Sequence, residues 1–180
     1  MTTLRIYTDG GCRGNQSDKN IGGWGALLVY GKHSKELHGG EANTTNNRME
    51  MTALLEALKA ITKENQTIEV FSDSSYLMDC FRKKWYVNWR KNGWKNAKKQ
   101  PVENRDLWEA LLPYLDIHSI SFYRVKGHVN IDSAAVNLDK LYEKFIEWNG
   151  SSFSYEDFLL ITEMNNEADR LANKGMDEVE

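Results

Sequence analysis

The stretch from Asn46 to Ile61 constrains the fold most, because its apolar residues recur at helical spacing and strand-like stretches lie on both sides of it. These strand-like stretches are residues 4–8, 24–30, 34–39, 67–71 and 117–125. Further helices are expected through Leu77 and Phe81 and over residues 103–115 and 165–174. This order of elements predicts an α/β fold in which helices pack on the faces of one mixed sheet.

Length and composition fit a single domain over residues 1–180. A chain of 180 residues, 41% of them apolar, can bury one core and offers no clear linker between two. No apolar run is long enough to span a bilayer, and the first residues lack the apolar centre of a signal peptide. The two cysteines, Cys12 and Cys80, are far apart and predict reduced thiols. We therefore expect a cytoplasmic monomer with no membrane role.

Charge is segregated along the chain, although the net charge is only −3. Residues 82–100, which we call the handle, contain eight Lys and Arg and no Asp or Glu. Such a stretch is typical of a surface that attracts nucleic acid. It also fits a helical hairpin whose tryptophans pack together and whose lysines are merely solvated. We expect both interpretations to hold in part.

Residues 129–164 have the opposite character, with seven acids against Lys140 and Lys144. Within them, Leu138, Leu141 and Phe145 belong to an apolar stripe at helical spacing that ends before Asn149-Gly150. A second short helix is expected over residues 155–161. An amphipathic helix must bury its apolar face, either on the body of the protein, in a dimer or against a partner.

Four acids lie at the ends or in the first turns of these elements: Asp9, Glu50, Asp73 and Asp169. Each has a plain structural explanation as well. Asp9 could sit in a turn with Gly10 and Gly11, and Asp73 could cap a helix. Glu50 could form a capping box with Asn47, and Asp169 could be an exposed helical acid. Glu50 is the most telling, because it projects from an apolar stripe where an unpaired carboxylate is costly.

Taken together, the four acids predict a metal site. Elements that pack on one sheet bring side chains together where the strands end. Clustered carboxylates repel one another unless cations neutralise them, and oxygen-only ligands suit Mg²⁺ or Mn²⁺ better than Zn²⁺. Two such ions about 4 Å apart can activate water and stabilise the leaving oxygen of an in-line displacement at phosphorus.

Five motifs resemble those of type 1 ribonucleases H of the bacterial kind. They are YTDGGCRGN at 7–15, TTNNRME at 44–50, SDS at 72–74, VKGH at 125–128 and NNEADRLA at 165–172. The resemblance covers residues 1–128 and 165–176 in the right order. It implies a five-stranded mixed sheet and an endonuclease that hydrolyses the RNA strand of RNA–DNA hybrids and leaves 5′-phosphate ends.

The resemblance also implies roles for single residues. It makes Asp9, Glu50, Asp73 and Asp169 the ligands of two Mg²⁺ ions, with Mn²⁺ as a possible substitute, and His128 a loop histidine that moves protons or helps product leave. The hybrid would be contacted in its minor groove, at a DNA phosphate and along the handle by Cys12, Asn15, Thr45, Asn46, Asn47, Trp85, Trp89, Lys91, Trp94 and Lys95. Sensing 2′-hydroxyls in the minor groove is how a protein distinguishes RNA from DNA.

The chain departs from this pattern in two places. The 36 residues from Val129 to Met164, which we call the insertion, separate the loop histidine from the final motif, and Asn166 replaces the usual Glu. The insertion could also mediate a dimer or bind a partner. Two other functions are weighed against hybrid cleavage: a hybrid-binding module that has lost catalysis and acts through the insertion, and a nuclease or transferase for DNA that shares only the sheet.

Overall fold

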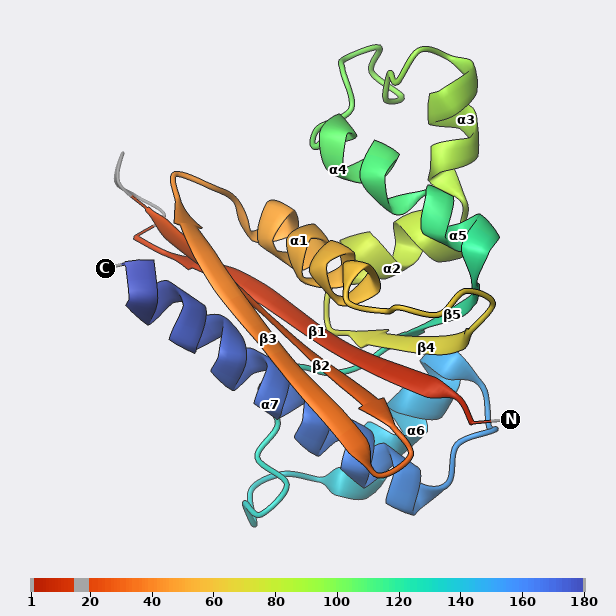
Figure 1. Cartoon of the computed structure of the whole chain (residues 1–180). Helices are drawn as coiled ribbons and strands as arrows, with labels where there is room; N and C mark the ends of the chain where they lie inside the picture. Colours follow the sequence, from red (N-terminus) through yellow and green to blue (C-terminus); the bar gives the residue numbers. More distant parts are fainter. Residues whose placement is uncertain (1, 15–19, 180) are drawn as a thin grey trace.

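The structure is a computed structural model that describes residues 2–14 and 20–179 (Figure 1). One five-stranded sheet lies at its centre, in the order β3-β2-β1-β4-β5. Its strands are β1 (Leu4–Arg13), β2 (Ile21–Tyr30), β3 (His33–Ala42), β4 (Thr67–Ser72) and β5 (Ser119–Arg124). The first three are antiparallel to one another, whereas β4 pairs parallel with both β1 and β5. The predicted five-stranded mixed sheet is thereby confirmed.

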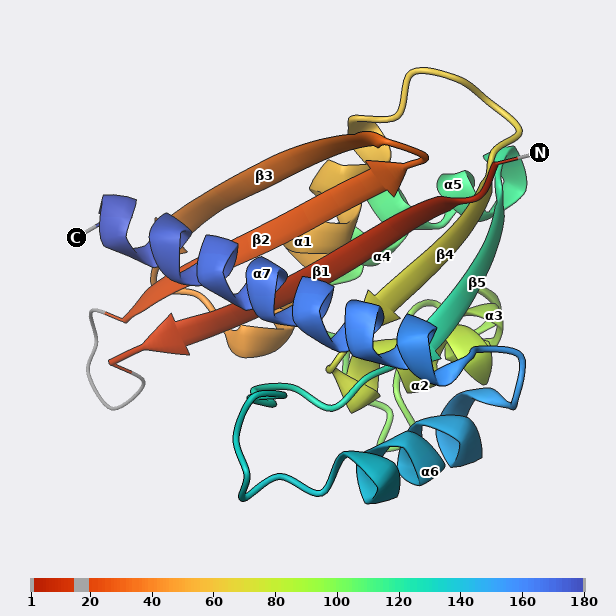
Figure 2. The same cartoon turned by 90° about the horizontal axis from the view of Figure 1, so that it is seen from below.

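Helices cover both faces of the sheet (Figures 1 and 2). One face carries α1 (Asn46–Lys59), α2 (Ser75–Arg82), α4 (Arg105–Leu111) and α5 (Pro113–Ile117), and the other carries α6 (Leu138–Asn149) and α7 (Tyr155–Val179). The short helix α3 (Trp85–Lys91) belongs to the handle and projects from the body. Each face has its own apolar core, because alternate residues of a strand point to opposite faces: Ile6 faces α1, whereas Tyr7 faces α7.

The first strand is longer than predicted, and Asp9 lies within it rather than at its end. Gly10 and Gly11 pair with β2, whereas the parallel pairing with β4 stops at Thr8. A Cβ atom on Gly10 would lie 2.5 Å from the backbone nitrogen of Glu50, so the glycine permits the close approach of α1. The glycines therefore mark a close contact in a strand, not the turn that the sequence indicated.

Two helix caps that were weighed as alternatives to metal binding do not form. Thr45 caps α1 by accepting a hydrogen bond from the backbone N–H of Arg48, so Asn47 and Glu50 do not form the capping box. Ser74, not Asp73, caps α2 by accepting from the N–H of Leu77. Both acids are therefore free of the structural roles that offered an alternative to metal binding.

The last part of the chain differs most from expectation. The two helices predicted over 155–161 and 165–174 are one continuous helix, α7, which contains Asn165 and Asn166 in its interior.

The helix predicted over 103–115 is instead divided into α4 and α5, because Pro113 cannot continue the hydrogen-bonding pattern.

The insertion packs on the body of the protein. Phe145 of α6 is 2% exposed, and its ring lies 5.6 Å from that of Phe153 and 5.5 Å from that of Phe158. These rings join Tyr7 and Phe71 of the sheet in one core. Of the three places weighed for the apolar face of α6, the body is the one observed.

No helix among the described residues combines the length and the apolar character that crossing a bilayer requires.

Candidate active site

Three carboxylates from separate elements meet beside the point where β4 ends. Asp9 comes from the middle of β1, Glu50 from the second turn of α1 and Asp73 from the segment that joins β4 to α2. One oxygen from each lies within 4.8 Å of the others. The pairing of β1 with β4 ends immediately before Asp9 and Asp73, so these two side chains flank the point where the strands diverge.

Asp169 completes the group from the opposite face of the sheet. It lies on α7, and its carboxyl is within hydrogen-bonding reach of Asp9. All four acids line one open cleft of about 780 Å³. The four residues singled out from the sequence are therefore brought together, although Asp169 is not among the three tightly clustered oxygens.

Burial dominates the electrostatics of this cleft. It raises the pKa of Asp9 to about 9, with the nearby charge of Asp73 as the next cause. Burial, followed by the charge of Asp9, raises the pKa of Glu50 well above its ordinary value. Burial also raises the pKa of Asp73. Such carboxylates keep their negative charge only where a cation or several donors compensate it.

The surrounding backbone fixes two of the acids. The backbone N–H of Gly10 donates a hydrogen bond to Glu50, and the Ser72 hydroxyl lies 3.5 Å from Glu50 Oε2. A Cβ atom on Gly127 would lie 2.1 Å from Asp73 Oδ2, so a side chain at this position would displace the carboxylate. Sequence reasoning did not single out Gly127 itself, although it lies within the VKGH motif.

His128 stands at the rim of the cleft. Its side chain is 74% exposed, and its Nδ1 lies 3.8 Å from Asp169 Oδ2. The residue has a φ of 57°, in the left-handed region that few residues other than glycine adopt. The histidine thus faces both the carboxylates and solvent.

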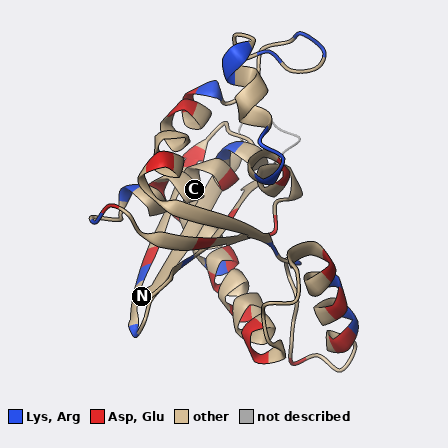
Figure 3. Ribbon diagram, turned by 90° about the vertical axis from the view of Figure 1, so that its right-hand side faces the viewer, with Lys and Arg blue, Asp and Glu red and all other residues tan. Residues whose placement is uncertain are grey.

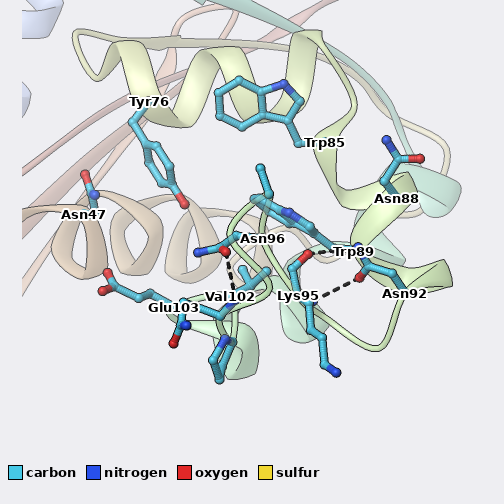
Figure 4. A pocket seen from close by; sticks show the side chains of 13 residues that line it. Asn47, Tyr76, Trp85, Asn88, Trp89, Asn92, Lys95, Asn96, Val102 and Glu103 are labelled. Carbon is cyan, nitrogen blue, oxygen red and sulfur yellow. Dashed lines mark hydrogen bonds between the residues drawn. The ribbon is translucent and has the colours of Figure 1, made fainter.

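The handle forms a second cleft, of about 930 Å³, beside the first (Figure 4). Both clefts are lined by Asn47 and by Tyr76, a residue that sequence reasoning did not identify. An aromatic residue in the first turn of the helix after Asp73 was the available signal.

The tryptophans of the handle divide between core and surface, as predicted. Trp94 is 8% exposed, and Trp89 lies between it and Trp108, with ring centroids 6.4 Å and 5.5 Å away. Trp85 is 36% exposed and lines the cleft with Trp89 and Lys95. Lys91 is exposed on α3. Figure 3 shows the Lys and Arg residues gathered on this projecting segment.

The other predicted contacts lie near the carboxylates. Cys12, Asn46 and Asn47 line the carboxylate cleft. Thr45 is exposed at the start of α1, where its hydroxyl caps the helix. Asn15 lies outside the described residues.

Comparison with known proteins identifies clear relatives. A family model described as RNase H matches residues 1–146. A ribonuclease H of Syntrophomonas wolfei is 52% identical over 128 residues, which cover 71% of this chain and 86% of the relative. A ribonuclease H of Clostridium botulinum is 40% identical over 178 residues, which cover 99% of this chain and 98% of the relative. That match includes the insertion.

Solved structures share the fold. The solution structure of the PFV RNase H domain has a TM-score of 0.64 at 22% identity and covers 100% of this chain, which covers 98% of it. LC9-RNase H1, a type 1 RNase H with the type 2 active-site motif, has a TM-score of 0.62 at 23% identity, with 93% of this chain and 85% of that one covered. LC11-RNase H1 in complex with an RNA/DNA hybrid has a TM-score of 0.54 at 18% identity, with 98% of each chain covered.

Proposed function

The chain belongs to the RNase H family, and from this premise we propose that it is an endonuclease that hydrolyses the RNA strand of RNA–DNA hybrids. The observation that carries the proposal is the cluster of Asp9, Glu50 and Asp73, whose oxygens lie within 4.8 Å of one another. The names of the relatives support the same activity, and the basic handle beside the cluster supports a polyanionic substrate.

The donor set fits divalent cations. Asp9, Glu50, Asp73 and Asp169 offer only carboxylate oxygens, which suit Mg²⁺ or Mn²⁺, and no cysteine or histidine belongs to the tight cluster among the described residues. We propose that these four residues hold two ions. When bound, the ions would neutralise the carboxylates, make water a stronger nucleophile and stabilise charge on the leaving oxygen.

The protein's own residues orient this centre. Gly10 and Ser72 hold the Glu50 carboxylate, and Gly127 leaves room for the Asp73 carboxylate beside the loop. In the proposed hydrolysis the oxygen of water loses a proton and forms a bond to phosphorus, the bond from phosphorus to O3′ breaks, and the 3′-oxygen takes a proton from solvent. His128 is proposed to move protons at the rim or to help the product leave, because it is exposed and close to Asp169.

Recognition of the hybrid is assigned to two surfaces. Cys12, Asn46 and Asn47 line the carboxylate cleft, where we propose that they contact the minor groove and its 2′-hydroxyls, together with Asn15. Thr45, exposed at the start of α1, is proposed to contact a phosphate of the DNA strand. On the handle, Trp85, Trp89 and Lys95 line the cleft and Lys91 adds charge, whereas the buried Trp94 supports the others.

The proposal is tested by incubating the protein with a hybrid whose RNA and DNA strands carry different labels. With Mg²⁺ the RNA strand should be cut internally into fragments with 5′-phosphates, and the DNA strand should stay intact. Excess chelator should stop the reaction, and added Mg²⁺ or Mn²⁺ should restore it. Binding without cleavage would identify a binding module instead, and preferential cutting of the DNA strand would identify a DNA nuclease.

We also propose that the protein acts as a monomer. The support is that the apolar face of α6 is already buried within the chain, with Phe145 2% exposed and Phe158 4% exposed. Light scattering on the purified protein should give the mass of one chain, 20.8 kDa.

A further inference from the structure

A third cleft, of about 470 Å³, lies between the insertion and the loop after β5. Asp73 and His128 line both this cleft and the carboxylate cleft, so the two adjoin at these residues. The carboxylate cleft therefore has two neighbouring clefts, and they meet it at different residues: the handle cleft at Asn47 and Tyr76, and this cleft at Asp73 and His128. A substrate longer than the carboxylate cleft can extend into both.

The third cleft is basic although the insertion is acidic. Arg124 and Lys126 line it from the end of β5, and Lys144 lines it from α6. The residues of α6 that line it lie at 141, 144, 145 and 148, and none of them is an acid. Glu143 and Glu147 of the same helix are exposed and do not line it, although Glu147 Oε1 is 3.5 Å from the Lys144 Nζ. Apart from Asp73 of the active centre, its charged lining is cationic.

Arg124 is a half-buried cation in the wall of this cleft. Its guanidinium carbon lies 4.1 Å from the centre of the Trp148 ring, and its Nε is buried without a hydrogen-bond partner among the described residues. The guanidinium keeps its positive charge while it lies on the Trp148 ring at the cleft, and a fixed charge of this kind favours an anion.

The wall of this cleft is firmly fixed. The Asn149 side chain accepts a hydrogen bond from the N–H of Arg124 at 2.9 Å and donates one to its carbonyl at 2.7 Å. Arg82 of α2 donates to the Trp148 carbonyl at 2.6 Å. The contacts of Asn149 with β5 and of Arg82 with Trp148 therefore hold this end of α6 in place. They fix the position of the Trp148 ring on which Arg124 lies.

We propose that this cleft binds the backbone phosphates of the strand being cut, on one side of the scissile bond, through Arg124, Lys126 and Lys144. The strand that carries the scissile phosphate must pass Asp73 and His128, and the adjoining cleft offers cations along its continuation. The inference rests on the proposed function, because it assumes that the scissile phosphate lies at the four carboxylates. It gives the insertion a role as a second phosphate-binding surface that is separate from the handle.

The test uses two series of hybrids with one fixed cleavage site, extended stepwise on either the 5′ or the 3′ side of it. Binding is measured by fluorescence anisotropy in chelator, and cleavage in Mg²⁺. Extension on the side that enters this cleft should tighten binding until the cleft is filled. In the double variant Lys126→Gln/Lys144→Gln, this gain should shrink about tenfold, and the slope of log affinity against log salt should flatten by about two for the extended hybrid.

The matched control is Lys32→Gln/Lys140→Gln, which removes two exposed lysines that line none of the three clefts. It should keep the full gain from extension. Lys126→Arg/Lys144→Arg should keep the gain as well, because the charge is retained. If the extension gain is equal in the wild type and Lys126→Gln/Lys144→Gln, the inference is wrong. If the wild type cuts no hybrid at all, the proposed function fails, which is a separate result.

Discussion

The handle and the insertion both add aromatic and basic side chains beside the carboxylate cleft, but they do so in opposite ways. The handle carries eight basic residues and no acid, and it exposes Trp85 at a cleft. The insertion is acidic as a whole, buries the rings of Phe145, Phe153 and Phe158, and places Lys144 at the cleft that adjoins the active centre. The net charge of a segment therefore indicates less about phosphate binding than the face on which each charge lies.

The largest expected effect is a loss of cleavage at the carboxylates that leaves binding by the handle and the insertion in place. Asp73→Asn should lower the rate of hybrid cleavage by about 10³-fold or more, because it removes a carboxylate from the tight cluster. Affinity for the hybrid in chelator should change by less than about threefold, because both flanking surfaces remain. Asp132→Asn, which changes an exposed acid of the insertion, is the matched control and should cleave normally. A similar loss of binding and cleavage would mean that the flanks do not bind independently of the centre.

The next effect distinguishes buried from exposed aromatic residues. Phe145→Ala should lower the free energy of unfolding by about 3–5 kcal/mol, because it leaves a cavity among Phe153 and Phe158. Trp85→Ala should cost about 1 kcal/mol, because its ring is partly exposed and meets Tyr76 and Trp89 edge to face. Urea denaturation measures both. Equal losses would show that the handle depends on Trp85 as a core residue.

The charge of the handle should matter through salt dependence. Lys91→Gln/Lys95→Gln should weaken hybrid binding and flatten the salt slope by about two, because each lysine attracts one phosphate. The measurement is hybrid affinity at several salt concentrations, and Lys32→Gln/Lys140→Gln is again the control. An unchanged slope would assign both handle lysines to a solvated surface without a function in binding.

The smallest effect concerns the contacts that attach the handle and the insertion to the body of the protein. Arg48 of α1 holds the start of α4, next to the handle, through Asp106, with Nη2 2.8 Å from Oδ2, and this ion pair lowers the pKa of Asp106. A lowered pKa gives stability that is present above the unfolded carboxyl pKa of about 3.9 and is lost as pH falls through the lower folded value. Asp106→Asn should therefore cost less than about 1 kcal/mol at pH 7, and this cost should shrink as the pH falls through the folded pKa.

The insertion is fastened differently, through the uncharged amide of Asn149. The loss of stability caused by Asn149→Ala should therefore be the same at pH 7 and at low pH. Thermal unfolding of the two variants at pH 7 and at low pH measures the contrast. A pH-independent cost for Asp106→Asn would mean that shape rather than charge joins Arg48 to Asp106.

The sequence predicted the sheet and α1 well, because each depends on a local period that tertiary contacts reinforce. It misread Gly10 as a turn residue, because glycine indicates freedom of the backbone but not whether another element needs the space. It divided α7 at residues 162–164, between the helices predicted over 155–161 and 165–174, whereas one helix that packs against β1, β2 and β3 runs through these residues.

For the candidate site, the sequence indicated which acids matter but not how they are supported. Asp9, Glu50, Asp73 and Asp169 were identified through motifs, and all four line one cleft. Gly127 and Tyr76 were missed because their importance lies in contacts between elements that are distant in the chain. Arg124 was missed for the same reason, since only the folded chain places it against Trp148.

The position of Asp169 within α7 also sets the order in which the centre is assembled during synthesis. Asp9, Glu50 and Asp73 belong to the first half of the chain, whereas Asp169 follows Asp73 by about 100 residues. At about 5–20 residues per second, the ribosome makes that stretch in about 5–20 s. During this interval the nascent chain holds three of the four carboxylates. The fourth arrives only when α7 docks across the strands made first.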